Sequence, residues 1–193
     1  MIDPGDEVAR ILEVIGRHGL KVKAIVNTHA HIDHVGGLSK MRQVTGAPVL
    51  MHREDLELYG HLDVQAAMVG LQVPAKADVD GFLGEGEKIC WGSFNAQVIH
   101  TPGHTKGSAC LYLSPEGISA ATDRRPRLFA GDTLFAGSIG RTDLWGGSFE
   151  QIMRSLKTKL LELPDETLVY PGHGPATTIG QERAENPFLI GKS

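Results

Sequence analysis

The stretch that decides the fold of this chain is Thr28-His29-Ala30-His31-Ile32-Asp33-His34, which directly follows an apolar run over residues 22–26. Its imidazole and carboxylate groups are donors that suit Zn, Fe and Mn. Side chains two positions apart on extended backbone point the same way, so His29 and His31 can bind one ion together. Asp33 and His34 follow where the chain leaves the strand and can turn toward a neighbouring point. Burying these groups without a shared partner would cost several kcal/mol, so the stretch predicts a metal site for two ions.

Three more polar residues occupy similar positions further along the chain. His104 follows an expected strand over 96–99, Asp132 follows Phe129-Ala130-Gly131, and His173 follows an expected strand over 168–170. Each lies among turn residues, and loops held by a rigid sheet commonly carry functional groups. Taken singly, a loop histidine or aspartate is more often simply solvated. Their occurrence together with the first cluster indicates that they belong to the same site.

The bulk composition is that of one ordinary globular domain, which we expect to span residues 1–193. Hydrophobic residues make up 41% and charged residues 22% of the chain, and the net charge of −4 gives no attraction to nucleic acid or to an anionic membrane. No apolar run approaches the ~20 residues of a membrane span, and the acidic start is unlike a signal peptide. Cys90 and Cys110 make no metal-type pair and are expected to be reduced thiols. We therefore expect a cytoplasmic protein.

Hydrophobic periodicity predicts an α/β fold. Val8, Ile11, Leu12 and Ile15 recur at helical spacing, and Ser148 opens a second clear helix with a capping-box pattern. A helix over 34–44 contains Gly36-Gly37 in its first turn, where the glycines favour a close approach of backbone to the metal loop or to a neighbouring strand. The segment 52–86 shows no clean strand and is expected to form a helix and a mobile flap. The expected strands cover residues 22–26, 49–51, 88–91, 96–99, 109–113, 127–130 and 168–170.

The chain resembles the metallo-β-lactamase-fold hydrolases, in particular the branch of glyoxalase II (hydroxyacylglutathione hydrolase) and its short relatives without the C-terminal helical domain. The segments that carry the resemblance are Thr28–Gly37, Thr101–Thr105, Gly131–Phe135, Gly140–Asp143 and Tyr170–Pro175. The resemblance implies a four-layer αββα sandwich with the site at one edge of two sheets. It also implies a dinuclear centre, with His29, His31 and His104 on one ion, Asp33, His34 and His173 on the other, and Asp132 bridging both.

The chain departs from this family at both ends. Relatives usually carry a strand hairpin before the Ile2-Asp3-Pro4-Gly5 match, so either the first N-terminal strands are missing or Met1 is a truncated start. An unpaired sheet edge invites pairing with another chain, which would favour a homodimer. At the other end the chain stops about twenty residues after His173, so the glutathione-binding positions of the helical domain cannot be carried over.

The resemblance implies a metal-dependent hydrolase acting on a small-molecule thioester, with Zn as the expected metal and Fe or Mn as alternatives. Two ions ~3.5–4 Å apart can lower the pKa of a shared water toward ~7. Asp33 is the expected proton carrier, and Asp132 would orient the nucleophile. Two alternatives stay open: a lactone, β-lactam or ester hydrolase on the same site, or a mononuclear-iron persulfide dioxygenase. A scaffold with a damaged site is a further, non-catalytic alternative.

Overall fold

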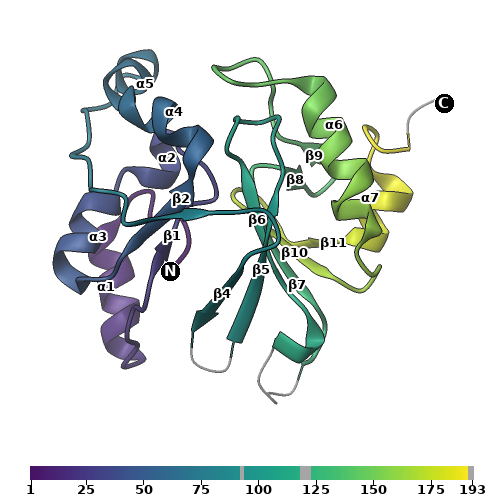
Figure 1. The fold of residues 1–193 in the computed structure, drawn as a ribbon, viewed down its shortest axis with the longest axis horizontal. Helices are drawn as coiled ribbons and strands as arrows, with labels where there is room; N and C mark the ends of the chain where they lie inside the picture. The colour runs from purple at the N-terminus through teal and green to yellow at the C-terminus, as the bar shows by residue number, and fades with distance from the viewer. Residues whose placement is uncertain (92–93, 118–122, 191–193) are drawn as a thin grey trace. The chain divides into compact units, whose positions relative to one another are not determined.

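The computed structural model describes residues 1–91, 94–117 and 123–190 (Figure 1). These residues form two compact units, Met1–Leu83 and Gly84–Ser193. Each unit has its own sheet and its own hydrophobic core. The combination of helices with mixed sheets confirms the predicted α/β class.

The first unit is built on a short parallel sheet in the order β1-β2-β3 (purple to blue in Figure 1). Ile2 adds to its edge through a parallel bridge to Val26. Parallel neighbours need crossover connections, and the helices of this unit supply them. Leu38 and Met41 of one such helix are fully buried against Ile25 of β1 in a common core. The elements are α1 (Val8–Arg17), β1 (Ile25–Val26), α2 (Ile32–Val35), α3 (Leu38–Thr45), β2 (Val49–His52), η1 (Arg53–Asp55), α4 (Leu56–Gly60), α5 (Leu62–Val69) and β3 (Gly81–Leu83).

The second unit contains a six-stranded sheet in the order β11-β10-β7-β6-β5-β4 and a separate hairpin of β8 and β9. β10 pairs with β7 in parallel, whereas the other neighbours in this sheet are antiparallel. The elements are β4 (Lys88–Trp91), β5 (Phe94–His100), β6 (Ala109–Leu113), η2 (Pro115–Gly117), β7 (Arg127–Gly131), β8 (Leu134–Phe135), β9 (Ser138–Ile139), α6 (Phe149–Thr158), η3 (Leu160–Glu162), β10 (Leu168–Pro171), β11 (Thr177–Thr178) and α7 (Ile179–Glu185).

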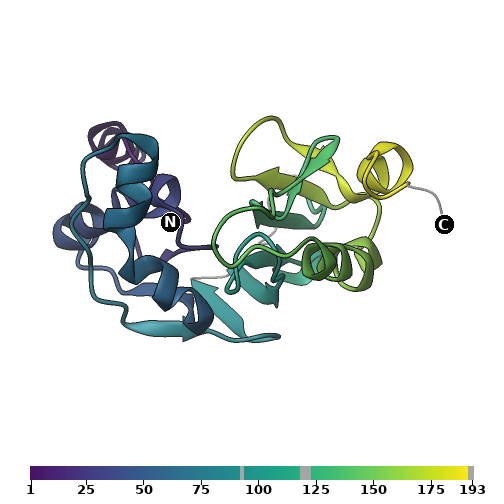
Figure 2. The same cartoon turned by 90° about the horizontal axis from the view of Figure 1, so that it is seen from above.

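Helices α6 and α7 cover one face of this second sheet (green and yellow in Figure 2). Ile152 and Leu156 of α6 and Ile179 of α7 are fully buried against Leu128 of β7. The predicted cap of α6 is confirmed, because the Ser148 hydroxyl accepts a hydrogen bond from the backbone of the third helical residue. Phe149, the first residue of α6, is 56% exposed.

Several boundaries differ from the sequence-based expectations. The first strand is only Ile25–Val26, and the helix expected over 34–44 is two helices that meet at Gly36-Gly37. A Cβ on Gly36 would lie 2.5 Å from the Gly5 carbonyl oxygen, so the backbone does approach closely here, but its partner is the turn at Pro4-Gly5 and not the metal loop or a strand. The segment 52–86 contains α4, α5 and the strand β3, which is too short to give an alternating signal of its own.

None of the helices in the described ranges is long and apolar enough to cross a membrane.

Candidate metal centre

The second unit brings three of the predicted ligands to one edge of its sheet. β5, β7 and β10 run in the same direction, because β10 is parallel to β7 and both β5 and β7 are antiparallel to β6. The loops after these three strands carry His104, Asp132 and His173 in that order. Asp132 Oδ2 lies 3.7 Å from His104 Nε2 and 3.8 Å from His173 Nε2.

These spacings fit a carboxylate that shares a cation with each of the two histidines. Metal–nitrogen and metal–oxygen bonds are about 2.0–2.2 Å long, so two donors on one ion lie no more than about 4.3 Å apart. Both separations exceed a hydrogen bond but remain below this limit. The Asp132 side chain is 12% exposed and lies between its two histidine neighbours. His104, Asp132 and His173 are therefore suitable ligands for divalent metal ions, with the Asp132 carboxylate close to both histidines.

The orientation of His104 is fixed from behind by the backbone. Its Nδ1 lies 2.8 Å from the carbonyl oxygen of Arg141. A carbonyl can only accept, so Nδ1 carries the proton and Nε2 keeps its lone pair on the side of Asp132. Gly140 lets the loops of His104 and Asp132 lie close together. A Cβ at this position would lie 1.8 Å from the Asp132 carbonyl oxygen and 3.2 Å from the His104 Cβ.

A buried polar cluster lies beneath the same two loops. Thr101 Oγ1 lies 2.9 Å from Thr133 Oγ1 and 3.4 Å from the sulfur of Cys110. Burial raises the pKa of the Cys110 thiol to about 11, so it is protonated at neutral pH. Cys90 is exposed, and both cysteines are free, as expected. This cluster links the loop of His104 to the loop of Asp132 and supports their positions.

The first unit gathers its own histidines. His29 and His31 lie edge to face with ring centroids 4.9 Å apart, and the His29 and His34 centroids are 4.0 Å apart. Asp33 Oδ2 lies 3.7 Å from His34 Nε2, and the Asp33 side chain is 52% exposed. Extended backbone at His31 (φ −69°, ψ 148°) leads into α2, which carries Asp33 and His34. The alternation of His29 and His31 therefore has the expected effect of placing both rings together.

Asp3 is a functional residue that the sequence analysis did not single out. Its Oδ2 lies 3.0 Å from His34 Nδ1 and accepts a hydrogen bond of 2.6 Å from the Thr28 hydroxyl. The Thr28 hydroxyl has one proton, which it donates to this carboxylate, so it accepts from His29 Nδ1 at 3.0 Å. Both imidazoles are thus protonated on Nδ1 and keep the lone pair of Nε2 for a metal. Asp3 lies in the segment Ile2-Asp3-Pro4-Gly5, which resembles the family, but no local sequence pattern linked it to a histidine 31 positions away.

Backbone contacts hold the ligand loop of the first unit in place. A Cβ on Gly5 would lie 1.7 Å from the carbonyl oxygen of Asp33, so only glycine permits this contact. Asn27 donates from its side chain to the carbonyl of His34 at 3.2 Å. The four predicted ligands of this unit are His29, His31, Asp33 and His34, and those of the other are His104, Asp132 and His173. Their assembly into one dinuclear centre stays a prediction.

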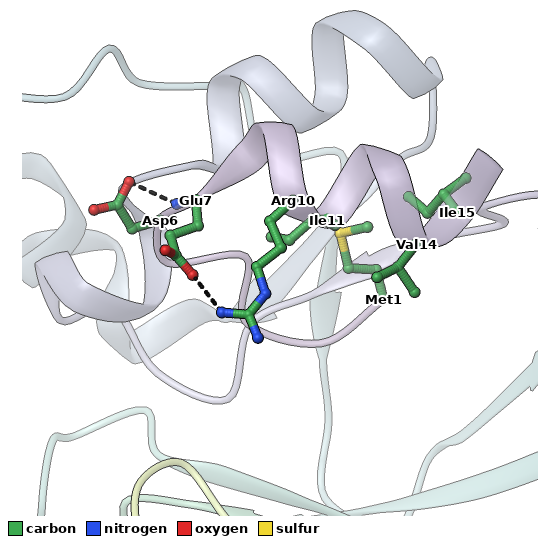
Figure 3. A pocket seen from close by; sticks show the side chains of 7 residues that line it. All are labelled: Met1, Asp6, Glu7, Arg10, Ile11, Val14 and Ile15. Carbon is green, nitrogen blue, oxygen red and sulfur yellow. Dashed lines mark hydrogen bonds and ion pairs between the residues drawn. The ribbon is translucent and has the colours of Figure 1, made fainter. Parts of the chain in front are cut away.

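A pocket in the first unit lies away from these ligands, over α1 (Figure 3). None of the seven predicted ligands lines it. Arg10 pairs with Glu7 at 3.0 Å, and the Asp6 carboxylate accepts a hydrogen bond from the Glu7 amide. The lining residues are Met1, Asp6, Glu7, Arg10, Ile11, Val14 and Ile15.

Comparisons with known proteins identify a family model and relatives that cover most of this chain. Residues 1–173 match the family model of the metallo-beta-lactamase superfamily. The chain is 38% identical to the hydroxyacylglutathione hydrolase GloC of Haemophilus influenzae, over 100% of this chain and 88% of that protein. The crystal structure of TTHA1623 in a di-iron-bound form is 43% identical, with a TM-score of 0.86 over 97% of this chain and 88% of that one. The crystal structure of the B3 metallo-beta-lactamase BLEG-1 is 37% identical, with a TM-score of 0.88 over 98% and 88%.

These matches cover almost the whole chain and confirm the predicted fold class. The chain belongs to the metallo-beta-lactamase superfamily.

Proposed function

We propose that this protein is a dinuclear metal-dependent hydrolase that cleaves thioesters of the hydroxyacylglutathione type. The observation that carries the proposal is the fixed protonation of its imidazoles. His29, His34 and His104 each use Nδ1 in a hydrogen bond, which makes Nε2 the nitrogen that could bind a metal. Three histidines held in this orientation, together with the Asp33 and Asp132 carboxylates, provide the nitrogen and oxygen ligands that a divalent cation requires.

In this proposal the ligands divide as the family resemblance implies. His29, His31 and His104 would hold one ion, Asp33, His34 and His173 the other, and Asp132 would contact both. When bound, two such ions lower the pKa of a water molecule toward ~7 and polarise the carbonyl group of the substrate. The di-iron form of TTHA1623 supports a two-metal centre. Zn, Fe and Mn all suit this donor set.

The residues of the chain would supply orientation and proton transfer. Asp33 has a half-exposed carboxylate, which lets it exchange a proton with solvent while it remains beside His34. Asp132 is nearly buried, where an unpaired negative charge is unfavourable. The cations that it would contact would stabilise its ionised form. A thiolate with a pKa near ~8.5 leaves without a strong general acid, which makes a thioester a suitable substrate for this site. The name of the GloC relative supports the same substrate class.

A substrate panel tests the proposal. Metal-loaded protein should hydrolyse S-lactoylglutathione faster than a lactone or a chromogenic β-lactam, and Asp132→Ala should abolish turnover while the circular dichroism spectrum stays unchanged. Elemental analysis should give two metal ions per chain. Turnover of the β-lactam alone would overturn the proposed substrate and favour the activity that the name of BLEG-1 indicates. One iron per chain with sulfide-dependent oxygen uptake would favour a persulfide dioxygenase instead.

A further inference from the structure

Two buried side chains outside the ligand set hold the backbone on both sides of His31. Asp55 ends η1 and is 1% exposed, and Gln65 lies in α5 and is 9% exposed. The amide N–H of Ala30 donates to Asp55 Oδ2 at 2.8 Å, and the amide N–H of Ile32 donates to Gln65 Oε1 at 3.0 Å. The Ala30 amide belongs to the peptide group that joins His29 to Ala30, and the Ile32 amide belongs to the peptide group that follows His31.

Gln65 uses both ends of its amide in this arrangement. Its Nε2 donates to the carbonyl oxygen of Ala30 at 3.2 Å and to the carbonyl oxygen of Leu58 at 3.0 Å. The side chain thereby ties the ligand loop to α4 and α5. Each of these groups is buried, and a buried donor or acceptor left unsatisfied is strongly unfavourable. The loop consequently has one strongly preferred conformation.

The conformation held in this way determines where the His31 ring points. His31 has extended backbone, and Gln65 restrains the peptide planes on either side of it, through the Ala30 carbonyl oxygen before it and the Ile32 amide after it. Asp55 restrains the peptide group between His29 and Ala30. With both planes fixed, the direction of the Cα–Cβ bond is fixed as well. The segment that contains Asp55 and Gln65 was expected to supply a mobile flap over the substrate, but these contacts give it a structural connection to the ligand loop.

We propose that Gln65 and Asp55 are positioning residues of the metal centre. Gln65 sets the direction of the His31 imidazole through the two peptide groups that flank His31, and Asp55 holds the peptide group before these, between His29 and Ala30. The inference rests on the proposed function, in which His31 is a ligand. Outer residues that orient metal ligands typically contribute about 10–100-fold to metal affinity or activity. The role predicted here is unusual because it acts through the backbone of the ligand and not through its ring.

The test compares metal affinity in matched glutamine variants. Gln65→Met keeps the length of the side chain and removes its hydrogen bonds, whereas Gln43→Met makes the same change at an exposed position of α3. Competition with a chromogenic chelator for Zn²⁺ should show an affinity about 10–100-fold lower for Gln65→Met and an unchanged affinity for Gln43→Met. Asp55→Asn keeps an oxygen acceptor for the Ala30 amide, so it should restore most of the affinity lost in Asp55→Ala.

A role in folding alone would give a different result. Gln65→Met would then lower the melting temperature of metal-loaded and chelated protein equally, and equal Zn²⁺ affinities would overturn the inference. Should Gln65→Met not fold, Gln65→Glu provides the same comparison, because it keeps the acceptor for Ile32 and loses both donors. Wild-type protein that binds Zn²⁺ but cleaves no thioester would overturn the proposed substrate. The Zn²⁺ affinities of Gln65→Met and Gln43→Met would still test the positioning role. Wild-type protein that binds no metal would overturn both.

Discussion

At the scale of single residues, Asp3 has the widest influence on the first unit. It accepts hydrogen bonds from Thr28 and from His34, and through the Thr28 hydroxyl it also fixes His29. Its backbone has a positive φ of 44°, a conformation that aspartate tolerates better than most residues. One carboxylate therefore determines the proton positions of two predicted metal ligands.

Replacing Asp3 should weaken metal binding more than it changes the fold. In Asp3→Ala the imidazoles of His29 and His34 lose the partner that keeps Nδ1 protonated, so we expect metal affinity to fall by about 10–100-fold. Chelator competition followed by elemental analysis measures this loss. Asp6→Ala is the control, because the exposed Asp6 side chain accepts only from the neighbouring Glu7 amide among the contacts described. Wild-type affinity in Asp3→Ala would contradict the assigned role.

The two cysteines should differ in reactivity. The thiolate is the nucleophilic form, and Cys110 has its pKa raised to about 11 by burial, whereas Cys90 is exposed. Iodoacetamide at pH 8 should modify one thiol per native chain and two per unfolded chain, with Cys90 identified by peptide mass spectrometry. Because the unfolded Cys110 thiol titrates near 9.0, its contribution to stability should be complete below that pH and fall between about 9 and 11. Equal labelling of both thiols in native protein would refute this.

At the scale of elements, the contact between the turn at Pro4-Gly5 and the junction of α2 and α3 is the tightest backbone packing in the first unit's ligand region. Gly37 donates from its amide to the carbonyl of Pro4 at 2.9 Å, and a Cβ on Gly37 would lie 2.7 Å from that oxygen. The sequence predicted the close approach but not its partner, because the turn lies some thirty positions earlier in the chain.

Two glycine-to-alanine substitutions should therefore have opposite effects on stability. Gly36→Ala places a methyl group 2.5 Å from the Gly5 carbonyl oxygen and should destabilise the protein by about 1–3 kcal/mol. Gly16→Ala lies in α1, where a Cβ meets nothing within 4 Å, and should stabilise it by about 0.5–1 kcal/mol. Urea unfolding followed by circular dichroism measures both values. A neutral Gly36→Ala would show that the junction is free to shift.

At the scale of the whole molecule, the sequence was enough to predict the α/β class and the strand-end positions of the candidate ligands. Short runs such as Leu168–Pro171 gave clear signals because they are bounded by turn residues and end in a histidine loop. β3, β8, β9 and β11 were missed, since two or three residues cannot show alternation. Asp3, Asp55 and Gln65 were missed for another reason: each acts on a residue at least 25 positions away, through contacts that exist only in the folded chain.

Removal of metal should lower the stability of the folded protein. A ligand that binds only the native state stabilises it by about 2.7 kcal/mol at a concentration 100-fold above its dissociation constant. Thermal unfolding with added Zn²⁺ should therefore give a higher melting temperature than unfolding with EDTA. Asp132→Ala should show a much smaller difference, because it lacks the carboxylate that would contact both ions in the proposed centre. An identical melting temperature for the wild type in Zn²⁺ and EDTA would argue against a metal centre.

The hydrogen bond from Thr28 to Asp3 has a thermodynamic consequence for the capture of an ion. The imidazole rings that these hydrogen bonds orient lose their rotational entropy when the protein folds. Metal binding therefore does not carry that entropy cost a second time. Calorimetric titration of the wild type should accordingly show a less unfavourable entropy of binding than titration of Asp3→Ala, whose rings must order as they coordinate.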